Sequence, residues 1–314
     1  MFKLAHISDI HLTPLPRPNL SELAGKRLTG YLNWLRHRKA VHQRAVLNDL
    51  IADMQAQAPD HIAVVGDLVN LSLPEEFQAA QNWLEALGDP EKISVVPGNH
   101  DAYVTSRSEP GIDRWRAYMN SNAEGARYKA TASDRFPYVR IFGPIALIGL
   151  STAIPTPPFQ AFGTLGGQQR RALASTLAQL AEQNLFRIVL IHHAPLEGQV
   201  SRRRSLRDSV ELSEILRKFG AELVVHGHNH QSSLHHLETA NGLIPICGVP
   251  SASSSGAHKH QPAAYNLYQI SKTGTGWRCE VESRGFHQPT STTPNGEIGE
   301  LARTILSASP DRDR

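Results

Sequence analysis

Short apolar runs alternate with helical patterns over the first two thirds of the chain. Each run is short and rich in β-branched residues, which is typical of buried strands. Between the runs, apolar residues recur every three or four positions, which is the period of one helix face. Strands that alternate with helices of this length predict an α/β domain. The runs occupy residues 4–7, 61–65, 93–96, 145–150, 188–191 and 223–225, and the helical patterns lie near 47–54, 77–87, 173–180 and 215–219.

The pattern changes after Gly227, where strand-like pieces follow one another without long helices. The last two pieces flank a Gly-containing turn at residues 272–276, which predicts a hairpin. We therefore expect a second, more antiparallel sheet in this part of the chain. The pieces lie at residues 234–237, 243–247, 264–270 and 277–282.

The ends of several elements also carry signals. Ser72 with Glu75, and Asp208 with Glu211, have the spacing of capping boxes and predict the starts of two helices. The segment from residue 288 onward is rich in Ser, Thr and Pro, with one weak helical turn at residues 297–306, and is expected to be mobile or docked. The predicted organisation is one domain over residues 1–286 followed by a tail over residues 287–314.

Composition narrows the class of protein. At 314 residues and 40% hydrophobic content, the chain can bury a substantial core. Cys247 and Cys279 are too few for a disulfide framework and are expected to be buried, reduced thiols. Asp9 comes too early for a leader peptide, and no apolar run is long enough to span a bilayer, so we expect a soluble cytoplasmic protein. The net charge of +3 gives no clear nucleic-acid partner.

Polar clusters follow the first three predicted strands. Asp9 and His11 follow the first, Asp67 the second, and Asn99 with His100 the third. An Asp-x-His pair alone is more often a polar loop, and Asp67 or Asn99 alone fits an ordinary turn. Because ligands collect at the carboxyl ends of strands in an open α/β sheet, three clusters at three such ends are expected to converge.

Histidines end two later strands. His192 and His193 follow residues 188–191, and His226, His228 and His230 end the next strand. Three histidines spaced by two rarely serve packing, and neutral imidazoles at such positions can reach two adjacent ions. Elsewhere in the chain, histidines are expected to be solvated, although either of the last two could line the cleft: His235, His236, His258 and His260.

Together the clusters closely resemble the calcineurin-like metallophosphoesterase superfamily, in the form of bacterial class III phosphodiesterases. The resemblance spans roughly residues 1 to 285 and implies a four-layer α/β/β/α sandwich of two mixed sheets, with a dinuclear metal centre above the strand ends. The motifs are Asp-Ile-His at 9–11, Gly-Asp-Leu-Val-Asn at 66–70, Gly-Asn-His-Asp at 98–101, His-His-Ala-Pro at 192–195 and Gly-His-Asn-His at 227–230.

The resemblance also implies a ligand set in which Asp67 bridges two divalent ions. The spacing does not separate His192 from His193, and families with this form use the first histidine, so we expect His192. One ion is then held by Asp9, His11, Asp67 and His230, and the other by Asp67, Asn99, His192 and His228.

The chemistry expected of such a centre is hydrolysis of a phosphorus–oxygen bond. Two ions about 3.5 to 4 Å apart can hold a bridging hydroxide, which attacks, and can clamp a phosphoryl oxygen. Carboxylate, amide and imidazole ligands without thiolate suit Mn, Fe, Zn or Co. In the resembling enzymes the counterpart of His100 contacts the phosphate and helps protonate the leaving oxygen, and Asp101 is expected to orient its ring.

Two basic insertions bear on the substrate. Residues 15–41 contain a helical pattern with Leu28, Tyr31, Leu32 and Leu35 on one face, beside Trp34. This segment could contact a membrane surface, or it could pack over the fold with its apolar face buried and its arginines solvated. The second insertion follows His193, and its arginines are candidates for phosphate binding, although they could belong to a solvated loop. They are Arg202, Arg203, Arg204 and Arg207.

The leading hypothesis is a metal-dependent phosphodiesterase acting on a small or nucleotide-type phosphodiester, such as a cyclic nucleotide or glycerophosphodiester. An alternative is a pyrophosphohydrolase of a nucleotide-linked lipid, resembling UDP-diacylglucosamine hydrolases, with residues 15–41 admitting the acyl chains. A third is a non-catalytic metal-binding scaffold. The strand-rich C-terminal part could also contribute to a dimer interface.

Overall fold

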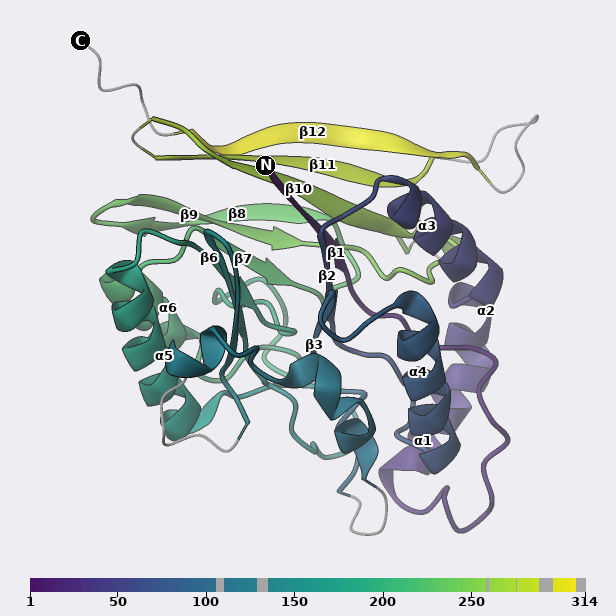
Figure 1. Cartoon of the computed structure of the whole chain (residues 1–314). Helices are drawn as coiled ribbons and strands as arrows, with labels where there is room; N and C mark the ends of the chain where they lie inside the picture. Colours follow the sequence, from purple (N-terminus) through teal and green to yellow (C-terminus); the bar gives the residue numbers. More distant parts are fainter. Residues whose placement is uncertain (106–109, 129–134, 258–259, 275, 288–295, 309–314) are drawn as a thin grey trace.

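Two six-stranded mixed sheets form the centre of the computed structural model (Figure 1). The structure describes residues 1–105, 110–128, 135–257, 260–274, 276–287 and 296–308. The strands are β1 Phe2–Ile7, β2 His61–Val65, β3 Ile93–Val96, β4 Tyr138–Phe142, β5 Ile145–Gly149, β6 Phe186–Leu190, β7 Leu223–His226, β8 Ser233–Thr239, β9 Gly242–Gly248, β10 Ala264–Lys272, β11 Trp277–Phe286 and β12 Ile298–Ala308.

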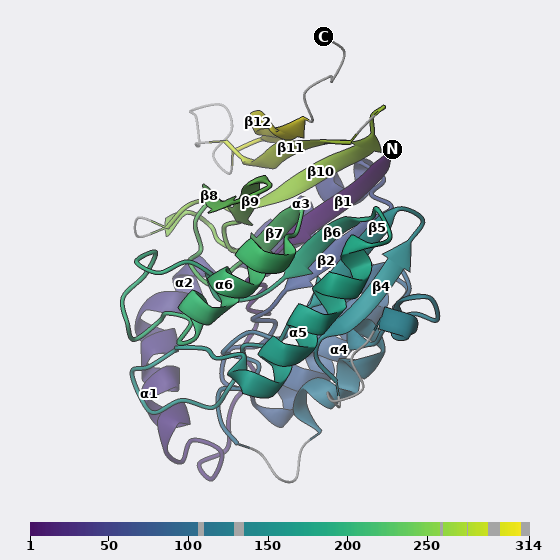
Figure 2. The same cartoon turned by 90° about the vertical axis from the view of Figure 1, so that its left-hand side faces the viewer.

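The helices lie mainly on the outer faces of the two sheets. In Figures 1 and 2, α3 and α4 cover one sheet, and α5 and α6 cover the other. The α-helices are α1 Lys26–Asn33, α2 Lys39–Val41, α3 Arg44–Ala56, α4 Pro74–Leu87, α5 Gly166–Ala181 and α6 Ser209–Phe219; a π-helix spans Trp34–Arg38, and 3₁₀-helices span Gly111–Met119 and Gly125–Tyr128.

The strand order explains why the site forms where it does. In the first sheet the order is β12-β11-β10-β1-β2-β3, with β1, β2 and β3 parallel. In the second it is β4-β5-β6-β7-β9-β8, with β5, β6, β7 and β9 parallel. The carboxyl ends of the parallel strands therefore lie at one edge of each sheet, as the sequence predicted.

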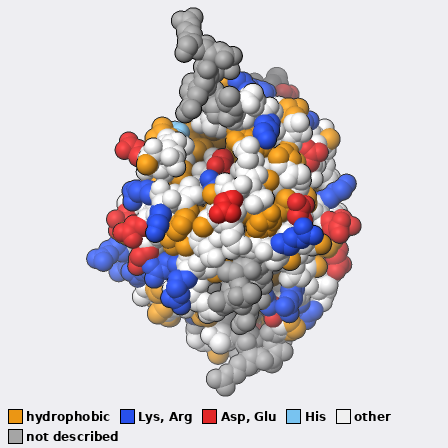
Figure 3. Space-filling model, turned by 60° about the vertical axis from the view of Figure 1, so that its left-hand side comes forward, with side chains coloured by type: hydrophobic (Ala, Val, Ile, Leu, Met, Phe, Trp, Pro, Cys, Tyr) orange, Lys and Arg blue, Asp and Glu red, His pale blue; other side chains and the backbone are white. Residues whose placement is uncertain are grey.

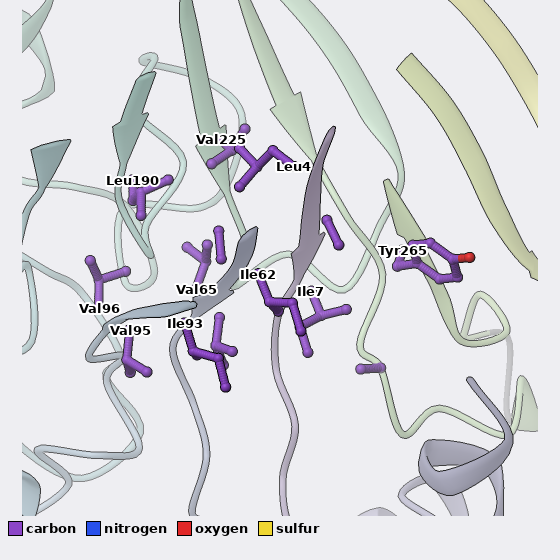
Figure 4. Close-up of a cluster of buried hydrophobic side chains, with 14 of the residues drawn as sticks. Leu4, Ile7, Ile62, Val65, Ile93, Val95, Val96, Leu190, Val225 and Tyr265 are labelled. Atoms are coloured by element: carbon purple, nitrogen blue, oxygen red, sulfur yellow. The ribbon is translucent and has the colours of Figure 1, made fainter. Parts of the chain in front are cut away.

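Alternating side chains build the layers. Ile188 and Leu190 of β6 point into the core between the sheets, where Leu4, Val65 and Val225 also lie (Figure 4). Val189 on the same strand belongs to a second cluster with residues of α5 and α6. Both faces of β6 are thus buried, which is why it reads as one continuous apolar run. The predicted four-layer α/β/β/α sandwich with two mixed sheets is confirmed.

The C-terminal strands do not form a separate sheet, so that prediction was wrong. β8 and β9 extend the second sheet, whereas β10, β11 and β12 extend the first, with β10 antiparallel to β1. The helical turn expected at residues 297–306 is strand β12, which pairs with β11 along most of its length. Periodicity in the sequence detects a strand but does not identify its partner. The division of the chain at residue 286 stays a prediction.

Neither predicted capping box forms, although α6 does begin directly after Asp208, as predicted. Helix α4 begins at Pro74, and the Glu76 carboxylate, not that of Glu75, accepts hydrogen bonds from the backbone N–H groups of Asn70, Leu71 and Leu73. Asp208 precedes α6, but its carboxylate accepts from the N–H groups of Leu165 and Gly166 at the start of α5. In both places the carboxylate caps backbone groups that sequence spacing alone did not identify.

The segment 15–41 also differs from the prediction. Tyr31 and Trp34 pack toward Leu15 and Tyr103, and Trp34 is buried. Leu28, Leu32 and Leu35 are exposed instead. In the described part of the chain, no helix is long and apolar enough to cross a membrane. On the face drawn in Figure 3, Lys and Arg side chains are mixed with Asp and Glu.

Candidate metal centre

The predicted polar clusters meet at a single cavity. It has a volume of about 690 Å³ and lies beyond the ends of β2, β3 and β7. Asp9 and His11, which follow β1, are fully buried beside the cavity-lining His230 and do not line the cavity themselves. His192, which follows β6, does not line the cavity, but its Nε2 atom lies 3.4 Å from Oδ2 of Asp67, which does. The described residues that line the cavity are Asn33, His37, Arg38, Val41, His42, Asp67, Asn99, His100, Ala161, Arg204, His228, Asn229, His230, Gln231, His260 and Gln261.

The backbone at five predicted ligands is left-handed. Asp9, His11, Asp67, His228 and His230 have φ values of 53°, 41°, 55°, 66° and 53°. Residues with a side chain rarely adopt this conformation, and such strain concentrates at functional sites. Each strand therefore ends in a sharp turn that brings polar side chains back over the sheet edge.

Glycines make room for these turns. At Gly66, a Cβ atom would lie 2.5 Å from His192 Nδ1 and 2.7 Å from the backbone nitrogen of Gly98. At Gly98, a Cβ atom would overlap the side chain of Asp67. The glycine that precedes each of Asp67 and Asn99 in the sequence is thus needed for close approach between neighbouring loops.

One group of donors consists of Asp9, His11 and His230, whose ligand atoms lie within 4.8 Å of one another. His230 Nε2 is 3.1 Å from Asp9 Oδ1, yet this buried oxygen has no hydrogen-bond donor. Donor atoms that converge without hydrogen-bond geometry suit a cation between them. His11 Nδ1 lies 3.2 Å from the carbonyl oxygen of Val69, which leaves Nε2 on the side of the two aspartates. The residues present therefore fit a divalent metal ion.

A second group consists of Asp67, His192 and His228. His192 Nδ1 donates to the Val65 carbonyl oxygen at 2.8 Å, so Nε2 faces Asp67 Oδ2 at 3.4 Å and Asn99 Oδ1 at 3.3 Å. A carbonyl that fixes the ring of a histidine in this way is typical of metal sites. This group also fits a divalent ion, and Asp67 lies between it and the first group, 3.8 Å from His11 Nε2.

The structure separates the two adjacent histidines. His193 lies with Nδ1 2.6 Å from the Thr152 hydroxyl and Nε2 3.1 Å from the Ala161 carbonyl oxygen. Both ring nitrogens of His193 are therefore engaged outside the two donor groups. His192 is the histidine whose Nε2 faces Asp67, which agrees with the expectation from the sequence.

The protonation states of the buried histidines at the site are set by burial and by the negative charge of Asp67. Burial lowers the pKa of His100 and of His193 to about 3, which keeps both rings neutral. Burial also acts on His192, but the neighbouring charge of Asp67 outweighs it and raises the pKa of His192 to about 9. A proton on His192 therefore takes the place that a cation beside Asp67 would occupy, and metal binding would release it.

Asp101 does not orient the ring of His100, so that expectation was wrong. Its carboxylate accepts hydrogen bonds from the backbone N–H groups of Asp67, Leu68, Val69 and Gly98, at 2.8, 2.9, 3.2 and 2.8 Å. These bonds hold the turn that presents the Asp67 side chain.

The acceptor for the ring is the Asn70 carbonyl oxygen, 2.5 Å from His100 Nδ1. Asn70 was already visible in the sequence as the last residue of the Gly-Asp-Leu-Val-Asn motif, but only as part of that motif. The Tyr103 ring stacks on His100, with their centroids 5.3 Å apart.

Both basic insertions reach the cavity, each through one arginine. Arg38, from the π-helix after α1, lies 3.3 Å from His100 Nε2 and 2.9 Å from His11 Nε2. Arg204 donates to the His228 carbonyl oxygen at 2.7 Å and also lines the cavity. No spacing signal in the sequence singles out Arg38 among the basic residues of the segment 15–41.

The other three candidate arginines lie elsewhere. Arg202 and Arg203 are exposed and do not line the cavity, and Arg207 lies over the Phe162 ring at 4.3 Å. His260 does line the cavity, whereas His258 lies outside the described residues. His235 and His236 are exposed on β8, as predicted.

Comparison with known proteins agrees with this geometry. The family described as calcineurin-like phosphoesterase matches residues 2–232. Over 100 residues the chain is 32% identical to the glycerophosphodiester phosphodiesterase GpdQ of Enterobacter lignolyticus, a match that covers 31% of this chain and 29% of that relative.

Two solved structures share the fold. A dimetal phosphatase from Danio rerio has a TM-score of 0.60 at 14% identity, covering 96% of this chain and 98% of the other. The purple acid phosphatase PPD1 from Lupinus luteus has a TM-score of 0.53 at 12% identity, covering 95% of this chain and 52% of the other.

Proposed function

The chain belongs to the calcineurin-like phosphoesterase family and is a metal-dependent phosphoester hydrolase, and from this premise we propose that it is a phosphodiesterase acting on a small or nucleotide-type phosphodiester. A cyclic nucleotide or a glycerophosphodiester represents this class. The observation that carries the proposal is the meeting of two donor groups around Asp67 at a cavity large enough for a small ligand.

The proposed ligands divide between two ions. Asp9, His11, Asp67 and His230 hold one, and Asp67, Asn99, His192 and His228 hold the other, with Asp67 shared. Bound divalent ions supply charge that neutralises phosphoryl oxygens and lowers the pKa of water. Oxygen and imidazole donors suit Mn, Fe, Zn or Co.

His100 is the proposed proton donor to the leaving oxygen. Its Nδ1 is fixed on the Asn70 carbonyl, so Nε2 is the atom left to act in the cavity. Burial, and then the charge of Arg38, lowers the pKa of His100. An anionic phosphate beside the ring would offset the charge of Arg38 and favour the protonated form.

A substrate panel tests the reaction class. Protein reconstituted with each of Mn, Fe, Co and Zn is expected to hydrolyse bis-(4-nitrophenyl) phosphate, and the panel adds a phosphomonoester, a cyclic nucleotide, glycerophosphodiesters and a nucleotide-lipid pyrophosphate. Asn99→Ala should lower kcat/KM by at least about 100-fold, because even groups that only support a ligand contribute 10- to 100-fold. Asn82→Ala, an exposed-face change on α4, is the control. A wild type inactive with every metal would favour the metal-binding scaffold.

Exposed leucines on the segment 15–41 support the alternative of a nucleotide-linked lipid substrate. Leu28, Leu32 and Leu35 are 47%, 42% and 45% exposed on the segment that also carries Arg38 into the cavity. Exposed leucines beside basic residues are typical of helices that lie at a membrane surface.

The expected result for that alternative is liposome binding that persists in salt. Replacing the three leucines by serine should abolish sedimentation with liposomes of phosphatidylglycerol and phosphatidylethanolamine. Trp34 is buried and is not a suitable probe, whereas Val210→Ser, at a 45%-exposed position on α6, is the matched control. Equal sedimentation of the triple variant and the wild type would exclude this role of the leucines.

A further inference from the structure

Three cationic side chains border the proposed metal centre. Arg38 and Arg204 line the main cavity, and Lys26 and Arg204 line an adjoining cavity of about 370 Å³. Among the described residues that line the two cavities, Asp67 is the one acid, and it is already a proposed ligand for both ions. Among the described lining residues, these three cations therefore face one carboxylate, although buried Asp9 and Glu76 behind the lining also act on the charge of Arg38.

Arg38 gives the most direct evidence. Its Nη2 atom lies 2.9 Å from each ring nitrogen of His11, and one of them, Nε2, is the atom proposed to bind a metal ion. A guanidinium group does not lose its proton in a protein. With an ion on His11, two positive charges would lie side by side at low dielectric, which is unfavourable unless an anion lies between them.

Lys26 lines the adjoining cavity. Its ammonium group donates to the Thr156 hydroxyl at 2.7 Å and to the Gln160 carbonyl at 3.2 Å, and it lies 4.2 Å from the centre of the Tyr103 ring. All three partners are uncharged. Burial lowers the pKa of Lys26 to about 8, so an anion in this cavity would stabilise its charged form.

The two cavities are continuous in their lining. Asn33, Asn99, His100, Ala161 and Arg204 border both. His100, the proposed proton donor to the leaving oxygen, therefore separates the place of the attacked phosphorus from the place of Lys26. The leaving group of a phosphodiester would extend into the adjoining cavity.

We propose that the leaving group carries a second phosphoryl group, held by Arg204 and Lys26 of the adjoining cavity and by Arg38, which lies beside His100 at the boundary of the two cavities. A simple phosphodiester has one negative charge, which metal ions balance, whereas the three further cations leave positive charge for the one or two negative charges of a second phosphoryl group. Water adds to the attacked phosphorus, the bond to the leaving oxygen breaks, that oxygen takes a proton, and the second phosphoryl group leaves unchanged. This inference rests on the proposed function and names the substrate class for the same site.

A binding measurement tests this inference without depending on catalysis. Isothermal titration of the manganese-reconstituted protein, in excess manganese, compares methylenediphosphonate with methylphosphonate. The diphosphonate is expected to bind the wild type at least about 30-fold more tightly. Arg38→Gln and Lys26→Gln should each weaken diphosphonate binding by about 10-fold, with a smaller effect on methylphosphonate. Arg36→Gln, exposed and outside both cavities, should bind as the wild type does.

The outcomes are distinct. Equal affinity of the wild type for the two phosphonates, or equal losses for both in Arg38→Gln and Lys26→Gln, would overturn the second phosphoryl site. Chelation of the metal by the diphosphonate would affect Arg36→Gln and Arg38→Gln alike, so it cannot imitate the expected difference. Failure of the wild type to hydrolyse bis-(4-nitrophenyl) phosphate would count against the proposed function. The second phosphoryl site is tested separately, by the comparison of phosphonate binding.

Discussion

Replacing Asp67 by asparagine is expected to lower kcat/KM for bis-(4-nitrophenyl) phosphate by at least about 1,000-fold. Asp67 is the one carboxylate that both proposed ions share, and loss of its charge weakens both sites at once. Several kcal/mol of charge stabilisation are at stake, and each 1.36 kcal/mol is a tenfold change in rate. Metal content, measured by mass spectrometry after desalting, should fall by about half or more.

Three measurements separate this effect from a loss of folding. The circular dichroism spectrum of the metal-free variant should match that of the metal-free wild type, because asparagine keeps the Oδ1 acceptor for the His100 N–H. Asp49→Asn removes an exposed carboxylate on α3 and should leave activity and metal content unchanged. An Asp67→Asn variant with full metal content and more than a tenth of the wild-type rate would refute the bridging role.

The donor residues of this site could be found in the sequence because metal chemistry admits few residue types. Asp9, Asp67 and Asn99 each follow a run that only a buried strand explains, and their convergence follows from the parallel sheet. Spacing alone did not separate His192 from His193, and His192 was chosen from the family resemblance. In the structure the two rings have different partners, and it is His192 whose Nε2 lies toward Asp67.

Arg38 could not be found in the same way. A helical reading of residues 15–41 assumes 3.6 residues per turn and places the longest apolar stripe against the protein. The chain instead changes to a π-helix at Trp34, which alters the rotation of every later side chain. Tyr31, in α1 before the π-helix, packs on the same side as Trp34, and Arg38, within the π-helix, lines the cavity.

The C-terminal strands show a second limit. Their existence was readable from period and turn residues, but their assignment to the two sheets depends on contacts distant in sequence. β10 pairs with β1, from Phe2↔Ile270 to His6↔Asn266. Strand β9, by contrast, pairs in parallel with β7. No local pattern distinguishes these outcomes, because each strand offers the same backbone groups to either neighbour.

Asp101→Ala is expected to destabilise the metal-free protein by about 4 kcal/mol or more. Asp101 is buried, and its two oxygens accept from four backbone N–H groups. An unpaired buried donor costs about 1–3 kcal/mol, so four of them account for the expected loss even at the low end. Thermal unfolding in the presence of EDTA, which removes stabilisation by bound metal, should show a melting temperature lower by about 6 °C or more.

Asp101→Asn is the matched variant. Its single carbonyl oxygen can still accept from two of the four N–H groups, while its amide group opposes the other two. Its stability should therefore lie between those of the wild type and Asp101→Ala. If Asp101 acted on the ring of His100 instead, asparagine and alanine would lower kcat alike without this graded loss of stability. A graded loss of stability would identify Asp101 as the residue that holds the turn at Asp67. The position of the Asp67 side chain would then depend on the backbone N–H groups that Asp101 binds.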